Sequence, residues 1–408
     1  SHIKKYNRKA ENRLITAEKF AAIAYKLLGL HYPNNKLQDG WEKVMFNQFH
    51  DILGGCSIKE AYDDALESYG AALNESAEVL NASIQKISWS IDTTNGEEQY
   101  LSKDMDWALW EKCNKGVPIV VFNPLSWPVT MPIQANKKVN SIKDSNGKTM
   151  QIQYVRASRT NADDKWDTLF IGDIPPMGYK VYWLYKEKDF PMPGCKKMLM
   201  AKDTYIENDW LKLEIEPHTG YISRLYDKIS KVEIFDGKAA VPIAIDEYDS
   251  DTWSHGIFEF RNEIGRFCDA QVCLIEDGPL RARIRVTNRY NASILRQDFI
   301  MYRDKKDIEV HVKLDWREKH KMLKLSFPVN IIDPKSTCEI PYGYIEKPIN
   351  GEEEPAQNWI DITGKYVDND HEVYGLSILN DCKYSFDIKG NDMRMTVVRS
   401  PIHADHFG

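Results

Sequence analysis

A histidine and an aspartate stand side by side near the end of an amphipathic segment, in the run WEKVMFNQFHDILGG. The His50 imidazole is of a type that often binds zinc, and the Asp51 carboxylate can accept hydrogen bonds from hydroxyl groups. A plainer interpretation is an exposed pair near a helix end, where a cation relieves unpaired carbonyl groups. Catalytic zinc takes three or four ligands, so this pair is at most one corner of a metal site.

A second polar cluster, DEYDSDTWSHG, lies between two predicted strands. Trp253 has the ring to stack on the face of a sugar, and Asp251 can accept hydrogen bonds from sugar hydroxyls. Loops carry binding residues more often than core elements do. The alternative is a solvated loop with one buried tryptophan. A calcium loop fits poorly, because the alternating oxygen ligands and the glycine of an EF-hand are missing.

Helices must position the His50–Asp51 pair. Apolar residues recur at helical spacing in three stretches, and Ser57-x-x-Glu60 has the spacing of a capping box. We therefore predict helices from Lys9 to Leu30, from Lys36 toward Ile52, and from Ile58 to about Ile91. Short connections between them indicate a compact three-helix bundle.

The remainder of the chain is typical of short strands. From about Val117, β-branched and aromatic runs alternate with turn residues, as in PIVVFNP, GYKVYWLY, WLKLEIE, ARIRVTNRY, DIEVHVKLDW and YGLSILND. Segments long enough to be crossover helices are lacking, which favours antiparallel sandwiches over a parallel sheet. The charge run NGEEEP, 350–355, is predicted to be a solvated turn.

These patterns predict an α+β multidomain fold, an N-terminal three-helix bundle followed by antiparallel β-sandwich domains. We place the helical domain at 1–95, a small β domain at 96–190, and a large, C-terminally incomplete β-sandwich at 200–408.

Composition excludes several classes of function. The chain has 408 residues and a formal net charge of -7, which argues against nucleic acid as a partner. No apolar run is long enough to span a bilayer, so no membrane partner is expected. The polar N-terminus predicts that this chain has no signal peptide. Seven widely spaced cysteines indicate reduced thiols and a cytoplasmic location.

The run NQFHDILGG, followed by Ser57-Ile58 and AYDDA, resembles the helical-domain signature of the family 38 α-mannosidases. Other runs resemble later parts of that family and follow in its order: KKYNRKAENRLITAEKFA, VFNPLSWPVT, NDWLKLEIEPHTGYISRLYDK, LDWREKHKMLKLSFPVNI, IPYGYIEKP, NWIDI, GLSILNDCKYSFDI and VVRSP. The sequence departs from the family pattern at Lys347, where arginine is expected, and at Ser385, where glycine is usual. Five or more such runs in order make the resemblance specific.

The resemblance implies a zinc-dependent, retaining glycoside hydrolase that acts on terminal α-mannosides in oligosaccharides, with a galactose-mutarotase-like large sandwich. His50 would be one of four zinc ligands, and Asp51 a substrate contact. Arg399 lies in a stretch that resembles one approaching the family's active site, so it is a fourth candidate substrate contact beside Asp51, Asp251 and Trp253. The alternative for Arg399 is a strand-end arginine in a surface ion pair.

The same resemblance places the other zinc ligands, the nucleophile and the acid/base in an N-terminal catalytic α/β domain that this chain lacks. We therefore assign no catalytic residue within the chain. Because a retaining glycosidase needs two carboxylates about 5 to 5.5 Å apart, the chain alone is expected to be inactive. One ligand of four should not hold the single zinc ion tightly.

The expected partners are a mannose-containing oligosaccharide and the N-terminal catalytic domain, and the family also forms homo-oligomers. An alternative function is a non-catalytic carbohydrate-binding or structural β-sandwich module. A third, a stand-alone mutarotase or lyase, needs a histidine and carboxylate set in the β region, which the sequence does not show.

Overall fold

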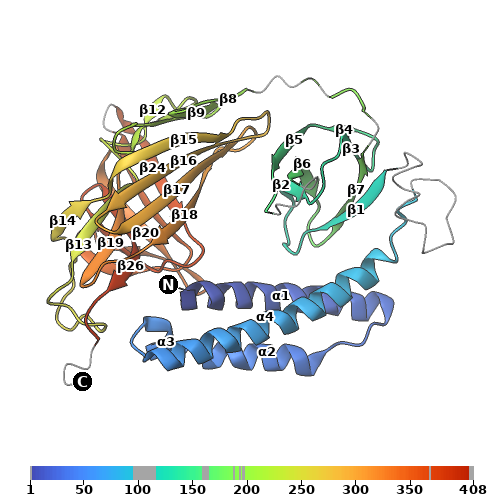
Figure 1. Cartoon of the computed structure of the whole chain (residues 1–408), viewed down its shortest axis with the longest axis horizontal. Coiled ribbons are helices and arrows are strands. Elements are labelled where there is room, and N and C mark those ends of the chain that lie inside the picture. The colour runs from blue at the N-terminus through green and yellow to red at the C-terminus, as the bar shows by residue number, and fades with distance from the viewer. Residues whose placement is uncertain are drawn as a thin grey trace.

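The structure is a computed structural model that describes residues 2–94, 116–158, 165–186, 189–192, 194, 198–366 and 369–403. Four helices come first, and the following elements are antiparallel strands (Figure 1). The predicted α+β fold, a helical bundle followed by antiparallel β-sandwich domains, is confirmed. The predicted domain boundaries stay predictions, and the one between 95 and 96 falls outside the described residues.

Four helices form the N-terminal bundle: α1 (His2–Leu28), α2 (Asn34–Phe46), α3 (His50–Gly54) and α4 (Lys59–Ser88). The three long helices pack through small and aliphatic side chains at helical spacing. Their shared core includes Ala10, Leu14, Ala17, Leu37, Val44, Ala65, Tyr69 and Ala72.

Two local predictions in the bundle are wrong. The helix expected to run from Lys36 toward Ile52 ends at Phe46, and a separate short helix begins at His50. At the break, Phe49 has φ -50° and ψ 135°, a non-helical ψ. The expected capping box does not form either, since α4 is capped by Ile58 without a side-chain hydrogen bond. The Ser57 amide donates instead to the Tyr62 hydroxyl, 2.9 Å away.

The small β body consists of two facing antiparallel sheets. One has the order β1-β7-β3-β4 and the other β2-β6-β5. Phe170, Tyr182 and Ile142, all with no exposed surface, fill the space between them. The strands are β1 (Val117–Phe122), β2 (Val129–Ala135), β3 (Ser141–Asp144), β4 (Thr149–Met150), β5 (Ile152–Arg156), β6 (Trp166–Ile174) and β7 (Tyr179–Tyr185).

The large β body contains four antiparallel sheets, with the orders β12-β11-β10-β9-β8, β14-β13-β19-β26-β25-β22, β15-β16-β17-β18 and β21-β20-β23-β24. The first strands are β8 (Leu199–Lys202), β9 (Tyr205–Asn208), β10 (Leu211–Ile215), β11 (Ile222–Asp227), β12 (Val232–Glu233), β13 (Val241–Asp246), β14 (Glu263–Arg266), β15 (Cys268–Glu276), β16 (Arg281–Tyr290) and β17 (Ser293–Tyr302). The others are β18 (Ile308–Asp315), β19 (Lys321–Pro328), β20 (Ile331–Ile340), β21 (Gly343–Lys347), β22 (Asn350–Pro355), β23 (Trp359–Tyr366), β24 (Asn369–Leu379), β25 (Ser385–Lys389) and β26 (Asp392–Ser400).

The charge run NGEEEP is a strand, not the predicted solvated turn. It forms β22, which pairs with β25. Glu353 in this strand bonds the ammonium of Lys324, a side chain with no exposed surface. The run looked solvated because its partner lies far away in the sequence.

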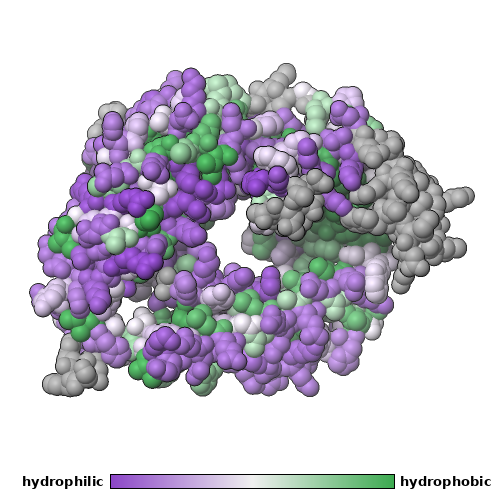
Figure 2. Space-filling view, viewed as in Figure 1, coloured by the Kyte–Doolittle hydropathy of each residue, from purple (hydrophilic) through white to green (hydrophobic). Residues whose placement is uncertain are grey.

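Helix α1 contacts both β bodies. Its C-terminal half reaches the small body, where Lys19 Nζ donates to the Pro124 carbonyl at 3.0 Å. Its N-terminal half reaches the large body, where Arg8 Nε donates to the Tyr384 hydroxyl at 3.2 Å. The helix thus connects the two β bodies (Figure 1). Figure 2 shows an opening between the helices and the β bodies.

The two β bodies also contact each other directly. The Gln153 side chain is buried, and its oxygen accepts hydrogen bonds from the amides of Leu280 and Arg281, at 3.0 and 2.8 Å. Its amide nitrogen donates to the Arg281 carbonyl at 2.9 Å. One glutamine therefore satisfies three backbone groups, and this contact closes the ring of three bodies.

Five cysteines in the described part of the chain are free: Cys56, Cys268, Cys273, Cys338 and Cys382. Cys113 and Cys195 lie outside the described residues. Within the described ranges, no helix combines the length and apolar composition that crossing a membrane requires.

Candidate functional site

The break between α2 and α3 places His50 and Asp51. Asn47 is buried at the C-cap of α2, and its side-chain Nδ2 donates to the Lys43 carbonyl at 2.7 Å. The buried Tyr69 hydroxyl donates to Asn7 Oδ1 at 3.0 Å and lies 3.3 Å from the Asn47 carbonyl. Burial raises the pKa of Tyr69, so this hydroxyl remains a donor. Because α1, α2 and α4 all contribute to this contact, the turn before His50 is fixed by the bundle core.

The His50 ring is on the surface, with 69% of its side chain exposed. The ring of Phe49 packs against it at 4.3 Å between centroids. His50 Nε2 lies 3.4 Å from Asp51 Oδ1. That carboxylate oxygen is buried and has no hydrogen-bond partner within the described part of the chain. The pair thus presents an accessible imidazole beside an acceptor with unused capacity.

Contacts on two sides attach α3 and the residues that follow it to their surroundings. Lys4 Nζ donates to the Leu53 carbonyl in the last turn of α3, where a cation is favoured. Burial lowers the pKa of this lysine, and the Lys383 ammonium lowers it further. On the other side, Cys56 Sγ donates to the Thr252 carbonyl at 3.7 Å. The second contact joins the bundle to the 246–256 loop of the large β body.

The 246–256 loop brings Trp253 next to His50. The two ring centroids are 6.0 Å apart, and 45% of Trp253 is exposed. Distant parts of the sequence therefore meet at one surface, where an indole, an imidazole and the Asp51 carboxylate lie together. The Phe49 ring, 52% exposed, extends the aromatic surface.

Asp251 holds this loop in shape. It is 8% exposed, and its Oδ1 accepts a hydrogen bond from the Trp253 amide at 2.9 Å. Its Oδ2 lies 2.8 Å from His255 Nδ1. The hydrogen bond from His255, aided by the backbone amides, lowers the pKa of Asp251 to about 2. Asp251 thus fixes the backbone that carries Trp253.

The lowered pKa of Asp251 makes a pH dependence testable. An aspartate whose pKa is lower in the folded than in the unfolded state stabilises the folded protein. This stabilisation is complete at pH values above the pKa that the aspartate has in the unfolded chain. We expect the difference in unfolding free energy between the wild type and Asp251→Asn to have its largest value above about pH 5. It should shrink as pH falls from about 4 toward about 2. Urea unfolding at a series of pH values checks this.

Asp249→Asn is the matched control, because Asp249 is an exposed carboxylate in the same loop. A stability difference for Asp251→Asn that stays constant from pH 5 to pH 3 would contradict the prediction.

Arg399 lies near the end of β26 and is directed into the protein. Its guanidinium pairs with Glu247, whose side chain has no exposed surface. It also donates to Ser250 Oγ at 3.3 Å and to the Asp251 carbonyl at 3.2 Å. The structure therefore shows an arginine in an ion pair, as the alternative interpretation expected, although Glu247 is buried and Arg399 is only partly exposed.

Glu247 is a site residue that the sequence did not single out. Burial raises its pKa, while the Arg399 charge acts in the opposite direction. Its Oε2 is buried without a hydrogen-bond partner among the described residues. The only signal in the sequence was an acid directly after the apolar strand β13. Its partner Arg399 lies 152 residues away, so spacing could not reveal the pair.

The side chains around His50 could provide one ligand of a metal site, but not the complete set of ligands. His50 presents an exposed imidazole beside the buried Oδ1 of Asp51, and an imidazole nitrogen can serve as one ligand of a zinc ion. No group of three or more His, Cys, Asp or Glu side chains able to hold a metal ion occurs in the described ranges. A zinc ion here would need ligands from elsewhere.

Two family models match this chain. The C-terminal domain of the glycosyl hydrolases of family 38 matches residues 206–407, and the alpha mannosidase middle domain matches residues 1–87. The first range covers most of the large β body, and the second covers the helical bundle up to, but not including, the last residue of α4.

Characterised relatives align along nearly the whole chain. Alpha-mannosidase G of Dictyostelium discoideum is 24% identical over 429 residues, covering 98% of this chain and 38% of the relative. An alpha-mannosidase of Saccharomyces cerevisiae is 24% identical over 420 residues, covering 98% and 33%. The chain thus spans about a third of the length of these relatives.

Solved structures share the fold. A family 38 glycosyl hydrolase from Enterococcus faecalis superposes with a TM-score of 0.76 at 15% identity, over 98% of this chain and 53% of the other. An alpha-mannosidase from Enterococcus faecalis V583 gives a TM-score of 0.74 at 14% identity. The arrangement of helical bundle and β bodies described above is therefore the arrangement found in those proteins.

Proposed function

The chain belongs to glycosyl hydrolase family 38, and from this premise we propose that it is part of a zinc-dependent α-mannosidase. The whole protein would hydrolyse terminal α-mannosides in oligosaccharides with retention of configuration. This chain would supply the bundle, the β scaffold and one zinc ligand, His50. The observation that carries the proposal is the meeting of His50, Asp51 and Trp253 at one surface.

Each of these side chains would have a distinct task. His50 would donate an imidazole nitrogen to the metal, and Phe49 would limit the motion of its ring. The Asp51 carboxylate, whose side chain is 33% exposed, would accept a hydrogen bond from a sugar hydroxyl. Trp253 would stack on the apolar face of the mannose ring. Bound zinc would orient the sugar and polarise its hydroxyls.

Asp251 and Arg399 act on the loop in this proposal. Their hydrogen bonds hold the backbone from 250 to 253, and thereby the angle of Trp253. That either one also touches the substrate stays a prediction. So do a cytoplasmic location and a homo-oligomeric state.

The rest of the chemistry would come from an α/β domain outside these 408 residues. Retaining hydrolysis requires a nucleophilic carboxylate and a second carboxyl group as acid/base, about 5 to 5.5 Å apart. We propose that this domain contributes both, along with the remaining zinc ligands, and docks on the surface around Phe49, His50 and Trp253. Exposed aromatic surface of this kind is typical of a contact site.

The isolated chain offers a direct test. We expect no measurable cleavage of an aryl α-mannoside by the purified chain, with or without added zinc, because both catalytic carboxylates are missing. The intact protein, assayed in parallel, should cleave it. Chelator-sensitive turnover by the chain alone would contradict the division of labour proposed here. An inactive intact protein would favour a carbohydrate-binding module instead.

A further inference from the structure

A stripe of basic side chains runs along α1. At 100° per residue, positions 5, 8, 9, 12, 13 and 16 fall within an arc of about 140° on the helix. The buried face, with Ala10 and Leu14, lies on the other side. Lys5, Lys9 and Arg13 follow one another at steps of four residues, so their Cα atoms are about 6 Å apart along the axis.

The charge of this helix is opposite to that of the whole chain. Helix α1 contains seven Lys and Arg residues and two Glu residues, whereas the chain carries a net charge of -7. Like charges four residues apart weaken a helix. The stripe is therefore not explained by helix stability, nor by an overall excess of basic residues.

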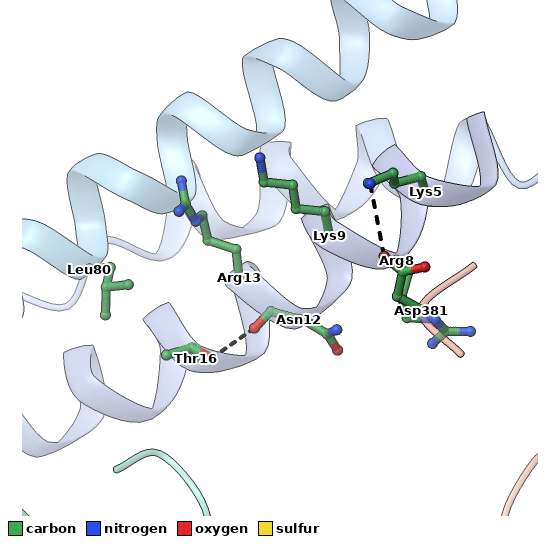
Figure 3. A pocket seen from close by; sticks show the side chains of 8 residues that line it. All are labelled: Lys5, Arg8, Lys9, Asn12, Arg13, Thr16, Leu80 and Asp381. Carbon is green, nitrogen blue, oxygen red and sulfur yellow. Dashed lines mark hydrogen bonds and ion pairs between the residues drawn. The ribbon is translucent and has the colours of Figure 1, made fainter. Parts of the chain in front are cut away.

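The stripe lines a hollow in the protein surface. Its volume is about 410 Å³, and it runs along α1 from Leu80 of α4 to Asp381 of the large β body. Figure 3 shows Lys5, Lys9 and Arg13 leaving the same side of α1, with their charged ends spread along it. A space of this size suits a small molecule.

Two of the four cations already have partners. Lys5 Nζ lies 3.9 Å from Asp381 Oδ2, and Arg8 Nη1 lies 2.9 Å from Glu11 Oε2. Asp381, the one acid in the hollow, is thereby partly neutralised. Lys9 and Arg13 are exposed and have no hydrogen-bond or ion-pair partner within the described ranges. The hollow thus contains two uncompensated positive charges about one helical turn apart.

We propose that this hollow binds the phosphate group of a small ligand. The planar guanidinium of Arg13 can donate two parallel hydrogen bonds to phosphate oxygens, and Lys9 can add a point charge. Asn12, between them, provides further donors, while the Thr16 hydroxyl already donates to the Asn12 carbonyl at 2.8 Å. The volume leaves room for a sugar ring attached to the phosphate. This site does not depend on the function proposed above.

The test is calorimetric titration of the full 408-residue chain at low ionic strength, with inorganic phosphate and with mannose 6-phosphate as probes. We expect a Kd below about 1 mM for at least one probe. The double variant Lys9→Gln/Arg13→Gln should weaken binding by at least about tenfold, because two charge-assisted contacts are lost. Lys26→Gln, an exposed charge on α1 outside the hollow, should bind like the wild type.

Glutamine has nearly the helix propensity of lysine and arginine, so the double variant should fold. Arg13→Lys provides a second test of phosphate binding. This variant keeps the positive charge but cannot donate two parallel hydrogen bonds to phosphate oxygens. It should bind with intermediate affinity. Tighter binding of the sugar phosphate would identify a phosphorylated sugar as the ligand, and equal binding would identify phosphate itself. The proposal is wrong if neither probe binds at about 10 mM, or if the double variant binds as tightly as the wild type.

Discussion

Replacing His50 by alanine in the intact protein is expected to remove zinc and activity together. The imidazole is exposed and, among the described residues, lies beside Phe49, Asp51 and Trp253 at the surface, so its loss should leave the fold intact. The loss of one of four ligands should weaken metal binding by several orders of magnitude, since a structural or catalytic zinc site depends on its full ligand set. We expect kcat to fall at least about a thousandfold, and zinc content to fall in parallel.

The matched control is His31→Ala. His31 is also exposed and lies in the same bundle, in the connection between α1 and α2. Zinc content by atomic emission and the rate on an aryl α-mannoside should both match those of the wild type for this variant. If His50→Ala kept full zinc and full rate, His50 would have no place in the site.

Replacing Lys324 by methionine is expected to cost about 3 to 5 kcal/mol of unfolding free energy. The Lys324 ammonium is fully buried and bonds both Asp387 and Glu353. Burial raises the pKa of Asp387, and the Lys324 charge acts in the opposite direction. Without the lysine, two carboxylates remain close together, with Arg261 as the cation paired with Asp387.

Urea unfolding followed by tryptophan fluorescence measures this cost. Lys36→Met is the control, because Lys36 pairs with Glu78 on the surface, where an ion pair contributes about 1 kcal/mol at most. Equal losses for the two variants would show that the buried network contributes no more than a surface pair. Because Glu353 lies in β22, the same experiment tests the importance of a strand whose sequence suggested a turn.

The sequence predicted the elements better than their boundaries. Amphipathic periodicity located the long helices, because each must bury one stripe in the shared core. It missed the break at Phe49, since that break depends on Tyr69 and Asn7, which approach the turn from other helices. The strands were recognisable from β-branched alternation. The NGEEEP strand was not, because its charges are compensated only by Lys324 in the folded protein.

The candidate site shows a similar division. The His50–Asp51 pair and the 246–256 loop stand out in the sequence. Nothing in the sequence, however, indicates that Trp253 of this loop lies next to His50. That proximity follows from the docking of the bundle against the large β body through contacts such as Cys56 to Thr252. The ion pair between Arg399 and Glu247 could not be predicted for the same reason. Chemistry can be read from local sequence, whereas the meeting of distant residues depends on tertiary packing.

The position of the metal in the intact protein tests the central claim most directly. A crystal structure with zinc located by its anomalous scattering would give the distance between the ion and His50. We predict that an imidazole nitrogen of His50 lies about 2.0 to 2.1 Å from zinc, with the other ligands supplied by the α/β domain. A zinc ion bound elsewhere, with His50 out of contact, would contradict the account.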